Sequence, residues 1–431
     1  MTRILDVYLH QQLVGQLTQN DEGKMSFRYN TQWLTHPNRV PLSISLPLQS
    51  PSFNTKACRG FFSGLLPEAD VRLQTANNLG ISPRNDFSLL ERIGGDCAGA
   101  VTFSAKGFPP QNISNNYNVL TQSELADTLR KLPQYPLLAG EDGIRLSLAG
   151  AQTKVAVHVK DNVISLPLNG APSTHILKPG NPRFPSLVFN EAFCMALARR
   201  VGLSVAAVEV RSVENMPYLL VERYDRKTTK GSDILERLHQ EDFCQAMGIV
   251  SELKYQSEGG PSLKTCIALI RHHSSAPAVD LVRFLDAVIF NYLIGNNDAH
   301  GKNFSFIYDW DSAFSPDFFD SENLGTPPSF KTGLSPLYDL VNTTYYPELS
   351  KNMAMSIGGE NQSDKILPQH FERFSAEVGL SKPAVISHTI QFARKVLATL
   401  DDPDLGGPVI DPIKLHIKQR GRRILDSWWK P

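Results

Sequence analysis

The stretches DLVRFLDAVIFNYLIG (280–295) and NNDAHGKNF (296–304) decide the fold, because they describe a buried helix that runs into a polar loop. Apolar side chains stand at 281, 284, 285, 288, 289 and 292, which is the i, i+3, i+4, i+7 spacing of a helix with one buried face. The loop carries Asp298 and, five positions later, Asn303. We therefore expect a core helix to present these two polar side chains at its C-terminal end.

An aspartate and an asparagine at this spacing suit phosphoryl transfer. That reaction needs a carboxylate to orient or deprotonate the attacking hydroxyl and oxygen ligands to hold Mg²⁺ on the phosphates. Asp298 is a candidate for the first role and Asn303 for the second. The spacing alone also fits an ordinary turn after a helix, where Asn and Asp are common, so both interpretations stay open at this point.

Three charged residues outside the loop fit the same chemistry. Asp339 lies between apolar residues in LSPLYDLVNT (334–343), where a buried carboxylate needs a partner or a metal ion. Lys178 ends a predicted strand, and Glu191 stands near the start of the next predicted helix, the pairing by which kinase-like enzymes direct an ammonium group at phosphates. The alternatives are a solvated strand end for Lys178 and a simple helix N-terminal complement for Glu191.

Strand patterns dominate before this region and helical patterns within and after it. Alternating apolar residues predict strands at ILDVYL, QLVGQL and PLSISLPL (41–48, an edge strand), a hairpin at KVAVHV (154–159) and VISLP (163–167), and strands at THILK (174–178), VAAVEVRSV (205–213) and YLLVERYD (218–225). Helices are expected around 64–79, 86–93 and 189–202, and a linker over 104–120. The expectation is an α+β fold of two lobes with a nucleotide in the cleft between them.

Composition excludes several classes of protein. The 431 residues predict two or three domains, and 41% hydrophobic with 20% charged residues is ordinary for a globular enzyme. Lys plus Arg and Asp plus Glu are 43 each, which gives no reason to expect a polyanion-coating protein, although a local patch could bind one. Five scattered cysteines argue against a disulfide framework and a zinc site. No apolar run is long enough for a membrane span, and the start MTRILDVYLHQQ is no signal peptide, so we expect a cytoplasmic protein.

The order of the motifs resembles the HipA family, the bacterial serine/threonine-kinase toxins of type II toxin–antitoxin pairs. The similar blocks are PLSISLP (41–47), FFSGLLPE (61–68), IGGDCAGAV (93–101), SLAGAQTKVAV (147–157), HILKPG (175–180), VERYDR (221–226), LHQEDFCQ (238–245), NNDAHGKNFS (296–305) and SPLYDL (335–340). The resemblance covers nearly the whole chain. It implies a two-lobed, protein-kinase-like α+β fold, with an N-terminal subdomain over 1–110, a β-rich nucleotide-binding lobe over 111–226 and a helical C-terminal lobe over 227–431.

The resemblance also implies a role for each motif residue. Asp298 is the catalytic base, Asn303 and Asp339 hold Mg²⁺, and Lys178 contacts phosphate with Glu191 as its partner. The segment Val221–Glu222–Arg223–Tyr224 is the hinge that takes the adenine edge. The remaining residues expected at the nucleotide are His300 and Lys302 of the catalytic loop and the phosphate loop, which consists of Leu148, Ala149, Gly150, Ala151, Gln152, Thr153 and Lys154.

Ser147 stands at the position of the family's regulatory autophosphorylated serine. Phosphate there would add about −1.5 to −2 charges beside the phosphate loop, so modification is expected to switch the enzyme off. The alternative is a hydroxyl that merely orders a turn. The chain lacks GxGxxG, HRD and DFG, which argues against a eukaryotic-type kinase, and residues 308–332 are expected to form an insertion or mobile loop.

The expected function is that of an ATP- and Mg²⁺-dependent serine/threonine-protein kinase toxin. The alternatives are a small-molecule phosphotransferase and a catalytically silent corepressor. By the resemblance, its partners are a HipB-like helix-turn-helix antitoxin, operator DNA mainly through that antitoxin, and a protein substrate, with glutamate–tRNA ligase as the family precedent. The basic segment 413–431 either touches DNA phosphates or forms a helix that packs Ile413, Leu415, Ile417, Ile424, Leu425 and Trp428 inward.

Overall fold

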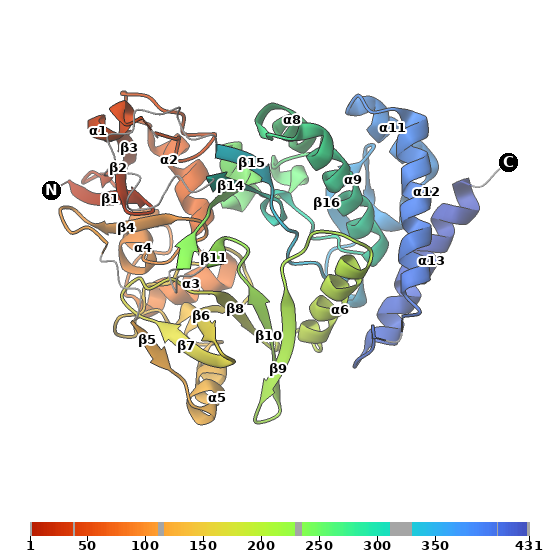
Figure 1. Cartoon of the computed structure of the whole chain (residues 1–431), viewed down its shortest axis with the longest axis horizontal. Helices are drawn as coiled ribbons and strands as arrows, with labels where there is room; N and C mark the ends of the chain where they lie inside the picture. Colours follow the sequence, from red (N-terminus) through yellow and green to blue (C-terminus); the bar gives the residue numbers. More distant parts are fainter. Residues whose placement is uncertain are drawn as a thin grey trace. The chain divides into compact units, whose positions relative to one another are not determined.

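The computed structural model describes residues 2–37, 39–110, 116–228, 235–310, 330–402 and 404–428. These residues form two compact units, and the chain enters each more than once (Figure 1). The first unit consists of Met1–Lys178, Arg223–Glu252 and Ser305–Gly333. The second unit consists of Pro179–Glu222, Leu253–Phe304 and Leu334–Pro431.

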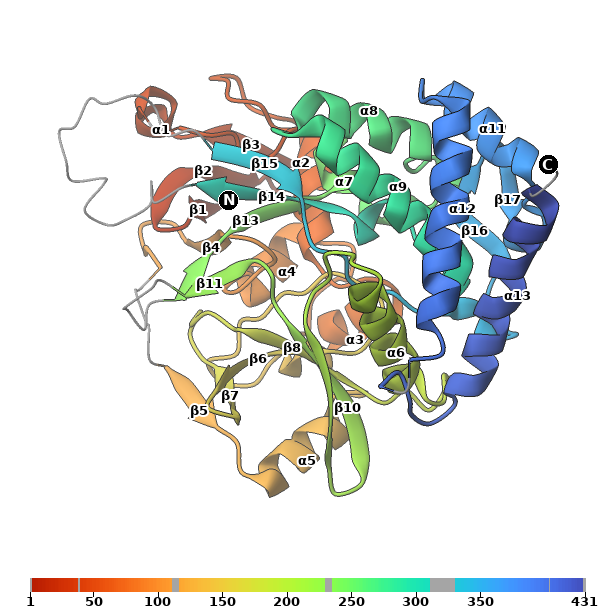
Figure 2. The same ribbon diagram turned by 45° about the vertical axis from the view of Figure 1, so that its right-hand side comes forward.

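The first unit is rich in antiparallel strands. Its strands are β1 (Arg3–Leu9), β2 (Gln12–Gln19), β3 (Met25–Tyr29), β4 (Val101–Ala105), β5 (Tyr117–Val119), β6 (Val155–Lys160), β7 (Val163–Pro167), β8 (His175–Pro179), β11 (Arg226–Thr228), β12 (Leu235–Arg237), β13 (His239–Asp242), β14 (Ser305–Trp310) and β15 (Phe330–Leu334). One sheet has the order β3-β2-β1-β4, another run is β5-β7-β6-β8, and β13-β14-β15 form a third. The third sheet is visible in Figure 2.

The helices of the first unit are α1 (Thr31–Thr35), α2 (Thr55–Phe62), η1 (Ser63–Leu65), α3 (Ala69–Asn78), α4 (Asp86–Ile93), α5 (Gln122–Lys131), η2 (Pro136–Leu138), α7 (Phe243–Ala246) and η3 (Ser251–Leu253). Helices α1, α2 and α4 pack on the N-terminal sheet of this unit. Phenylalanines fill the core of the unit: Phe27, Phe61, Phe62, Phe87, Phe103, Phe243 and Phe306 are fully buried. Helix α2 approaches the residues after α7 so closely that a Cβ at Gly60 would lie 2.6 Å from the Gly248 carbonyl oxygen.

The second unit is mostly helical. Its elements are α6 (Leu187–Arg200), β9 (Val208–Val213), β10 (Met216–Glu222), η4 (Gln256–Glu258), α8 (Leu263–His273), α9 (Pro277–Ile294), η5 (Gly301–Asn303), η6 (Thr343–Tyr345), β16 (Asn352–Ile357), β17 (Glu360–Gln362), η7 (Ser363–Lys365), α11 (Pro368–Glu377), α12 (Lys382–Thr399) and α13 (Ile410–Trp428). Helix α9 packs against α8, α12 and α13 (Figure 1). None of the helices in the described ranges is long and apolar enough to cross a membrane.

Most of the expected elements are present. The long helix is α9, and of its six expected core positions all but Leu281, which is half-buried, are buried. The hairpin β6–β7 pairs Lys160 with Val163 across Asp161 and Asn162, both at positive φ as a two-residue primed turn requires. The expected insertion lies largely outside the described residues, as does part of the expected linker.

The expectations for PLSISLPL and for Leu415 were wrong. PLSISLPL is not a strand: its serines turn inward, where Ser43 donates to the Glu241 carboxylate and Ser45 to the Gln245 carbonyl oxygen. These contacts replace a strand ladder, which Pro41 and Pro47 could not complete without N–H groups. On α13, Leu415 is 54% exposed instead of packed, because Ile413 and Ile417 occupy the buried stripe.

Candidate active site

The predicted catalytic loop joins α9 to β14. Gly295 ends α9 in the left-handed conformation (φ +72°), and a Cβ there would lie 2.5 Å from the Thr344 hydroxyl oxygen. The next residues are held on both sides: the Asn297 N–H donates to the Thr343 hydroxyl (2.8 Å), and its carbonyl accepts from the Ala354 N–H (2.7 Å). Asp298 therefore stands on a backbone that is fixed immediately before it.

Asp298 is exposed to solvent, which a base for an external hydroxyl requires. Its carbonyl accepts the His300 N–H (2.8 Å), which shapes the turn into η5. One carboxylate oxygen, Oδ1, accepts a hydrogen bond of 2.7 Å from the Tyr255 hydroxyl. His300 and Lys302, the other two predicted residues of the loop, are buried, and the Lys302 carbonyl accepts from the Tyr338 hydroxyl (2.7 Å).

The two predicted metal ligands meet in the second unit. Asn303 Nδ2 lies 3.1 Å from Asp339 Oδ2, and Asn303 Oδ1 accepts from the His300 N–H. Asp339 has φ +58°, a strained backbone for a residue other than glycine. It is half-buried, so the expectation of a buried carboxylate was wrong; partial exposure keeps some of the hydration that a buried carboxylate would lose. A carboxylate oxygen and an amide oxygen are ligands that suit Mg²⁺, and the contact between the two side chains brings one of each into the same place.

Neighbouring segments hold Asp339 in place. Before it, Leu337 pairs with the segment that precedes β9: its N–H donates to Ser204 (2.8 Å), and its carbonyl accepts from Ala206 (2.9 Å). After it, Asn342 exchanges two hydrogen bonds with Asn190 of α6, at 2.9 and 3.0 Å. Because the chain is hydrogen-bonded on both sides of Asp339, these contacts hold its strained backbone conformation in place.

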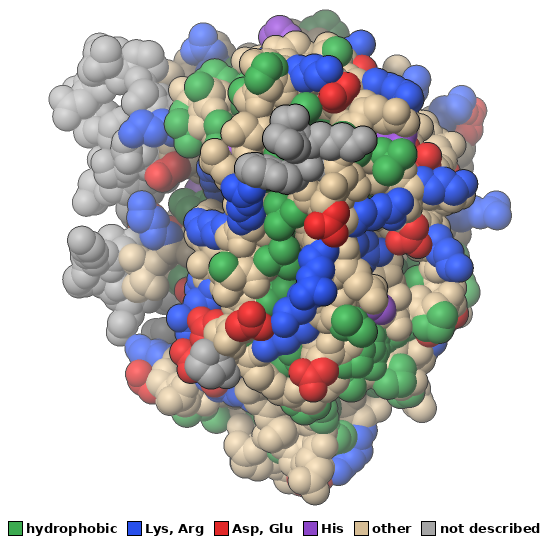
Figure 3. Space-filling view, turned by 90° about the vertical axis from the view of Figure 1, so that its right-hand side faces the viewer, with side chains coloured by type: hydrophobic (Ala, Val, Ile, Leu, Met, Phe, Trp, Pro, Cys, Tyr) green, Lys and Arg blue, Asp and Glu red, His purple; other side chains and the backbone are tan. Residues whose placement is uncertain are grey.

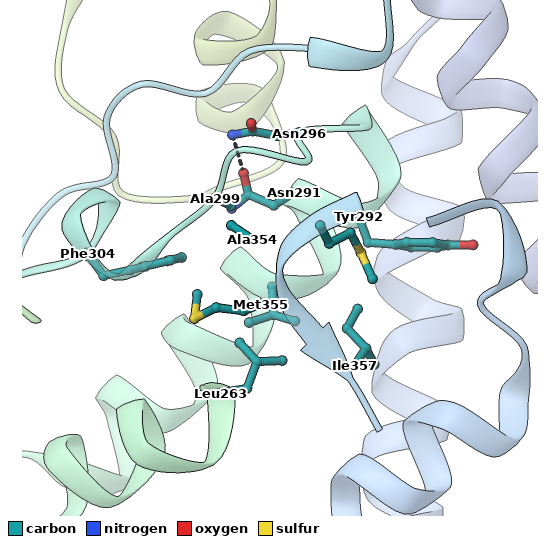
Figure 4. A pocket seen from close by; sticks show the side chains of 11 residues that line it. Leu263, Asn291, Tyr292, Asn296, Ala299, Phe304, Ala354, Met355 and Ile357 are labelled. Atoms are coloured by element: carbon teal, nitrogen blue, oxygen red, sulfur yellow. Dashed lines mark hydrogen bonds between the residues drawn. The ribbon is translucent and has the colours of Figure 1, made fainter. Parts of the chain in front are cut away.

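Asn296 ties the catalytic loop to the metal-side segment. Its Nδ2 donates to Asn291 Oδ1 (2.8 Å, dashed in Figure 4) and lies 3.4 Å from the Asp339 carbonyl oxygen, while its Oδ1 accepts the Asp298 N–H (3.2 Å). Next to these residues lies a cavity of about 30 Å³, which is lined by Asn291, Asn296 and mainly apolar side chains, among them residues of α8, α9 and β16. It is large enough for one water molecule. The buried amide thus links the two predicted functional loops.

The predicted phosphate loop belongs to the first unit. Gly150 has φ +109°, and Lys154 Nζ donates to the Ala149 carbonyl (2.6 Å), which closes the loop on itself. The Gly150 carbonyl accepts from the Glu68 N–H (3.1 Å) of the FFSGLLPE block. Leu148 is buried, whereas Ala151 is exposed and the residues Gln152 and Thr153 are partly so.

Ser147, just before this loop, is completely buried. Its hydroxyl donates to the Leu65 carbonyl (2.7 Å), and its N–H donates to the Asp96 carbonyl (3.0 Å). In this conformation the hydroxyl cannot meet a phosphate donor. Modification of Ser147 therefore requires the segment to leave its position.

Lys178 and Glu191 are both buried, at 6% and 1% exposure. Lys178 lies in β8 of the first unit and Glu191 in α6 of the second. Burial of both charged groups excludes the solvated strand end considered for Lys178. Their pairing with each other stays a prediction.

The predicted hinge has some of its backbone groups already bonded. The Glu222 N–H donates to Ala207 (2.8 Å) and the Arg223 N–H to Thr174 (2.9 Å). An adenine edge would therefore have to use other backbone groups of this segment. The Tyr224 hydroxyl contacts Gln240.

A buried ion cluster surrounds the Arg223 side chain in the first unit. Arg223 donates to Asp225 (2.8 Å) and Ser173 (2.9 Å), while Arg226 and Arg237 donate to Asp96 (2.8 and 3.2 Å). Burial alone would raise the pKa of Asp96 and of Asp225, but the arginines outweigh it and lower both pKa values. Burial lowers the pKa of Arg226 to about 10. The cluster therefore stays ionised and joins the IGGDCAGAV block to VERYDR.

The sequence interpretation missed three contributors to this arrangement: Tyr255, Asn296 and Asp96. Tyr255 had no signal, because it lies 43 positions from its partner Asp298. Asn296 stands two positions before the predicted base, and an amide so close to it is itself a signal. Asp96 was inside a quoted block, and a lone aspartate among glycines and alanines could have been identified as a candidate for ion pairing.

Comparison with known proteins finds two family models that match this chain. The HipA-like C-terminal domain model matches residues 146–400, and the HipA N-terminal domain model matches residues 5–104. A Sinorhizobium fredii protein, Y4mE, is 44% identical over 387 residues, 89% of this chain and 87% of its own length. The serine/threonine-protein kinase toxin HipA of Shewanella oneidensis is 27% identical over 423 residues, 95% of this chain and 91% of its own length.

A solved structure matches nearly the whole chain. It is that of the Shewanella oneidensis HipA, HipB and operator DNA complex, with a TM-score of 0.80 at 25% identity, covering 98% of this chain and 96% of that one. The kinase-like α+β fold expected from the sequence is confirmed. The chain belongs to the HipA family of serine/threonine-protein kinase toxins.

Proposed function

We propose that this chain transfers the γ-phosphoryl group of ATP, with Mg²⁺, to a serine or threonine of a protein and so acts as the toxin of a toxin–antitoxin pair. The observation that carries the proposal is the anchored set of Asp298, Asn303 and Asp339, an exposed carboxylate beside an amide–carboxylate pair. Against a small-molecule phosphotransferase stand family membership and similarity to a named protein kinase.

Each predicted site residue would have a separate role in phosphoryl transfer. Asn303 and Asp339 would hold Mg²⁺, which neutralises the developing charge on the phosphates. Gly150 and its neighbours would offer N–H groups to phosphate oxygens, and Lys178 an ammonium group. Asp298 orients the acceptor hydroxyl and accepts its proton.

We propose that phosphorylation of Ser147 inactivates the enzyme. A phosphate on this side chain would place acceptor oxygens against the Leu65 carbonyl, which now accepts the hydroxyl hydrogen at 2.7 Å. Two acceptors repel, and a buried dianion lacks solvation, so the modified segment cannot return. The phosphate loop that begins at Leu148 would be displaced with it.

Partners follow from the relative solved with HipB and operator DNA. We propose a helix-turn-helix antitoxin and, through it, operator DNA; the family precedent for the protein substrate is glutamate–tRNA ligase. The basic segment on α13 is less suited to DNA than its composition suggests. Lys418 pairs with Asp401 (2.8 Å), Arg420 is 11% exposed, and Lys and Arg on the face that carries α12 and α13 are interspersed with Asp and Glu (Figure 3).

The test is transfer of ³²P from γ-labelled ATP to proteins of a bacterial extract, followed by phosphosite identification. Asp298→Asn should reduce transfer by orders of magnitude and leave ATP binding nearly intact, whereas Asp339→Asn should also weaken Mg²⁺-dependent ATP binding. Mass spectrometry of purified wild type should find phosphate on Ser147, and none in Asp298→Asn. Near-normal transfer by Asp298→Asn would refute the assignment.

A further inference from the structure

Tyr255 lies outside the catalytic loop and contacts the proposed base. Its hydroxyl donates to Asp298 Oδ1 at 2.7 Å, and its ring meets the His300 ring edge to face, with centroids 5.5 Å apart. Both contacts fall on the catalytic loop, at the first and third residues of DAH (298–300). Tyr255 therefore contacts the loop at two separate groups, the Asp298 carboxylate and the His300 ring.

The segment that carries Tyr255 is itself fixed. The Tyr255 carbonyl accepts from the N–H groups of Glu258 (3.0 Å) and Gly260 (2.9 Å), which folds the segment into a tight turn around η4. The next side chain, Gln256, accepts the Ser356 N–H of β16 (2.8 Å) through Oε1. Gly260 packs so closely that a Cβ would lie 2.3 Å from the Leu253 carbonyl oxygen. A phenol on such a turn has a defined position.

We infer that Tyr255 is a positioning residue, which holds the Asp298 carboxylate in the orientation that receives the acceptor hydroxyl. This inference rests on the proposed function, in which Asp298 is the base. A carboxylate on an exposed loop otherwise rotates about two side-chain torsions. A fixed donor at one oxygen restricts both, so the carboxylate is oriented before the acceptor arrives.

If Tyr255 instead blocked the site of the acceptor hydroxyl, the expected effect of its removal would be the opposite. A serine or threonine hydroxyl would donate to the same carboxylate, so a phenol that only occupied the acceptor's position would have to be displaced. Removing it would then accelerate transfer. Under the positioning role, removing the hydroxyl slows transfer, because a hydrogen bond to a charged group is lost.

The variant is Tyr255→Phe, which keeps the ring against His300 and removes the donor. We expect the transfer rate at saturating ATP to fall about ten- to a hundredfold, while the Kd for ATP–Mg²⁺ stays within about twofold. Tyr346→Phe is the matched control: its hydroxyl also donates within the second unit, to the Pro185 carbonyl (3.2 Å). Transfer is measured from γ-³²P-labelled ATP to a clarified bacterial extract, ATP binding by calorimetry, and folding by thermal melting.

A double variant separates this inference from the proposed function. In an Asp298→Asn background, Tyr255→Phe should cause no further loss, because its effect passes through the carboxylate. Unchanged or faster transfer by Tyr255→Phe, with Asp298→Asn inactive, overturns the positioning role and leaves the base assignment standing. An active Asp298→Asn overturns the proposed function itself. A parallel loss of ATP binding and melting temperature in Tyr255→Phe would show a structural role and also overturn the inference.

Discussion

Asp96→Asn should destabilise the first unit strongly, because it removes one of two carboxylates from a buried cluster that holds three guanidinium groups. Asp96 is completely buried and accepts from Arg226 at 2.8 Å, Arg237 at 3.2 Å and the Ser173 hydroxyl at 2.6 Å. The asparagine amide would leave Asp225 as the one carboxylate among the three guanidinium groups of the cluster. One carboxylate oxygen, a hydrogen-bond acceptor, would also be replaced by an NH₂ group that faces the Arg and Ser173 donors. Breaking a buried ion pair on one side costs about 3–5 kcal/mol.

Urea denaturation measures this loss. With an m-value of about 3 kcal/mol/M, the midpoint for the first unit should fall by about 1–2 M. The control is Asp127→Asn, which removes an exposed pair with Arg130 (2.9 Å, side chains 61% and 51% exposed) and should cost at most about 1 kcal/mol.

The pH dependence gives a second check. The pKa of Asp96 is lower in the folded chain than the usual value of about 3.9 in an unfolded one. Its contribution is therefore fully present above about pH 4 and is lost as pH falls through the folded pKa. The difference between wild type and Asp96→Asn should be constant from about pH 5 to 8 and shrink below about pH 4. A difference under about 1 kcal/mol at pH 7, or one that persists unchanged at pH 3, would refute the reasoning.

Three further predictions concern other parts of the chain. Burial raises the pKa of Glu241 to about 7 despite hydrogen bonds from Ser43, Tyr308 and Ile44, so the stability that its protonated form contributes is present below about pH 4 and lost as pH rises through 7. In urea titrations from pH 5 to 8, the free energy of unfolding of Glu241→Gln should rise by up to about 3 kcal/mol relative to that of wild type, and a difference that stays constant with pH would contradict this. Arg420→Ala should lower the free energy of unfolding by about 1–3 kcal/mol, because Arg420 donates to Thr344 (3.2 Å) and packs on Gly295. Replacement of the exposed Arg422 by alanine should leave the free energy of unfolding within about 0.5 kcal/mol of wild type, and equal effects of the two variants in thermal melting would contradict the prediction. Gly150→Ala should weaken ATP binding about tenfold in calorimetry, because φ is +109° and the new Cβ would lie 2.7 Å from Lys154 Nζ; wild-type affinity would argue against the phosphate loop.

Local patterns were enough for the secondary structure around the site. Helix α9 follows from its apolar spacing, its end from Gly295, and the β6–β7 hairpin from two alternating runs around Asp161 and Asn162. The proximity of Asn303 to Asp339 was expected from motif order and is present at 3.1 Å. These features depend on residues a few positions apart or on blocks long enough to carry a family resemblance.

The tertiary structure decided the surroundings of the functional groups. It placed Tyr255 on Asp298, the Ser147 hydroxyl on the Leu65 carbonyl and Ser43 on Glu241, contacts that span 43, 82 and 198 positions. It also left Asp339 half-buried where apolar neighbours predicted burial. Periodicity reports only which face of its own element a residue lies on, because it repeats over a few positions. The contacts of that face depend on how distant segments pack. PLSISLPL is not a strand, because its serines form hydrogen bonds with Glu241 and Gln245, about 200 positions away in the sequence, instead of a strand ladder.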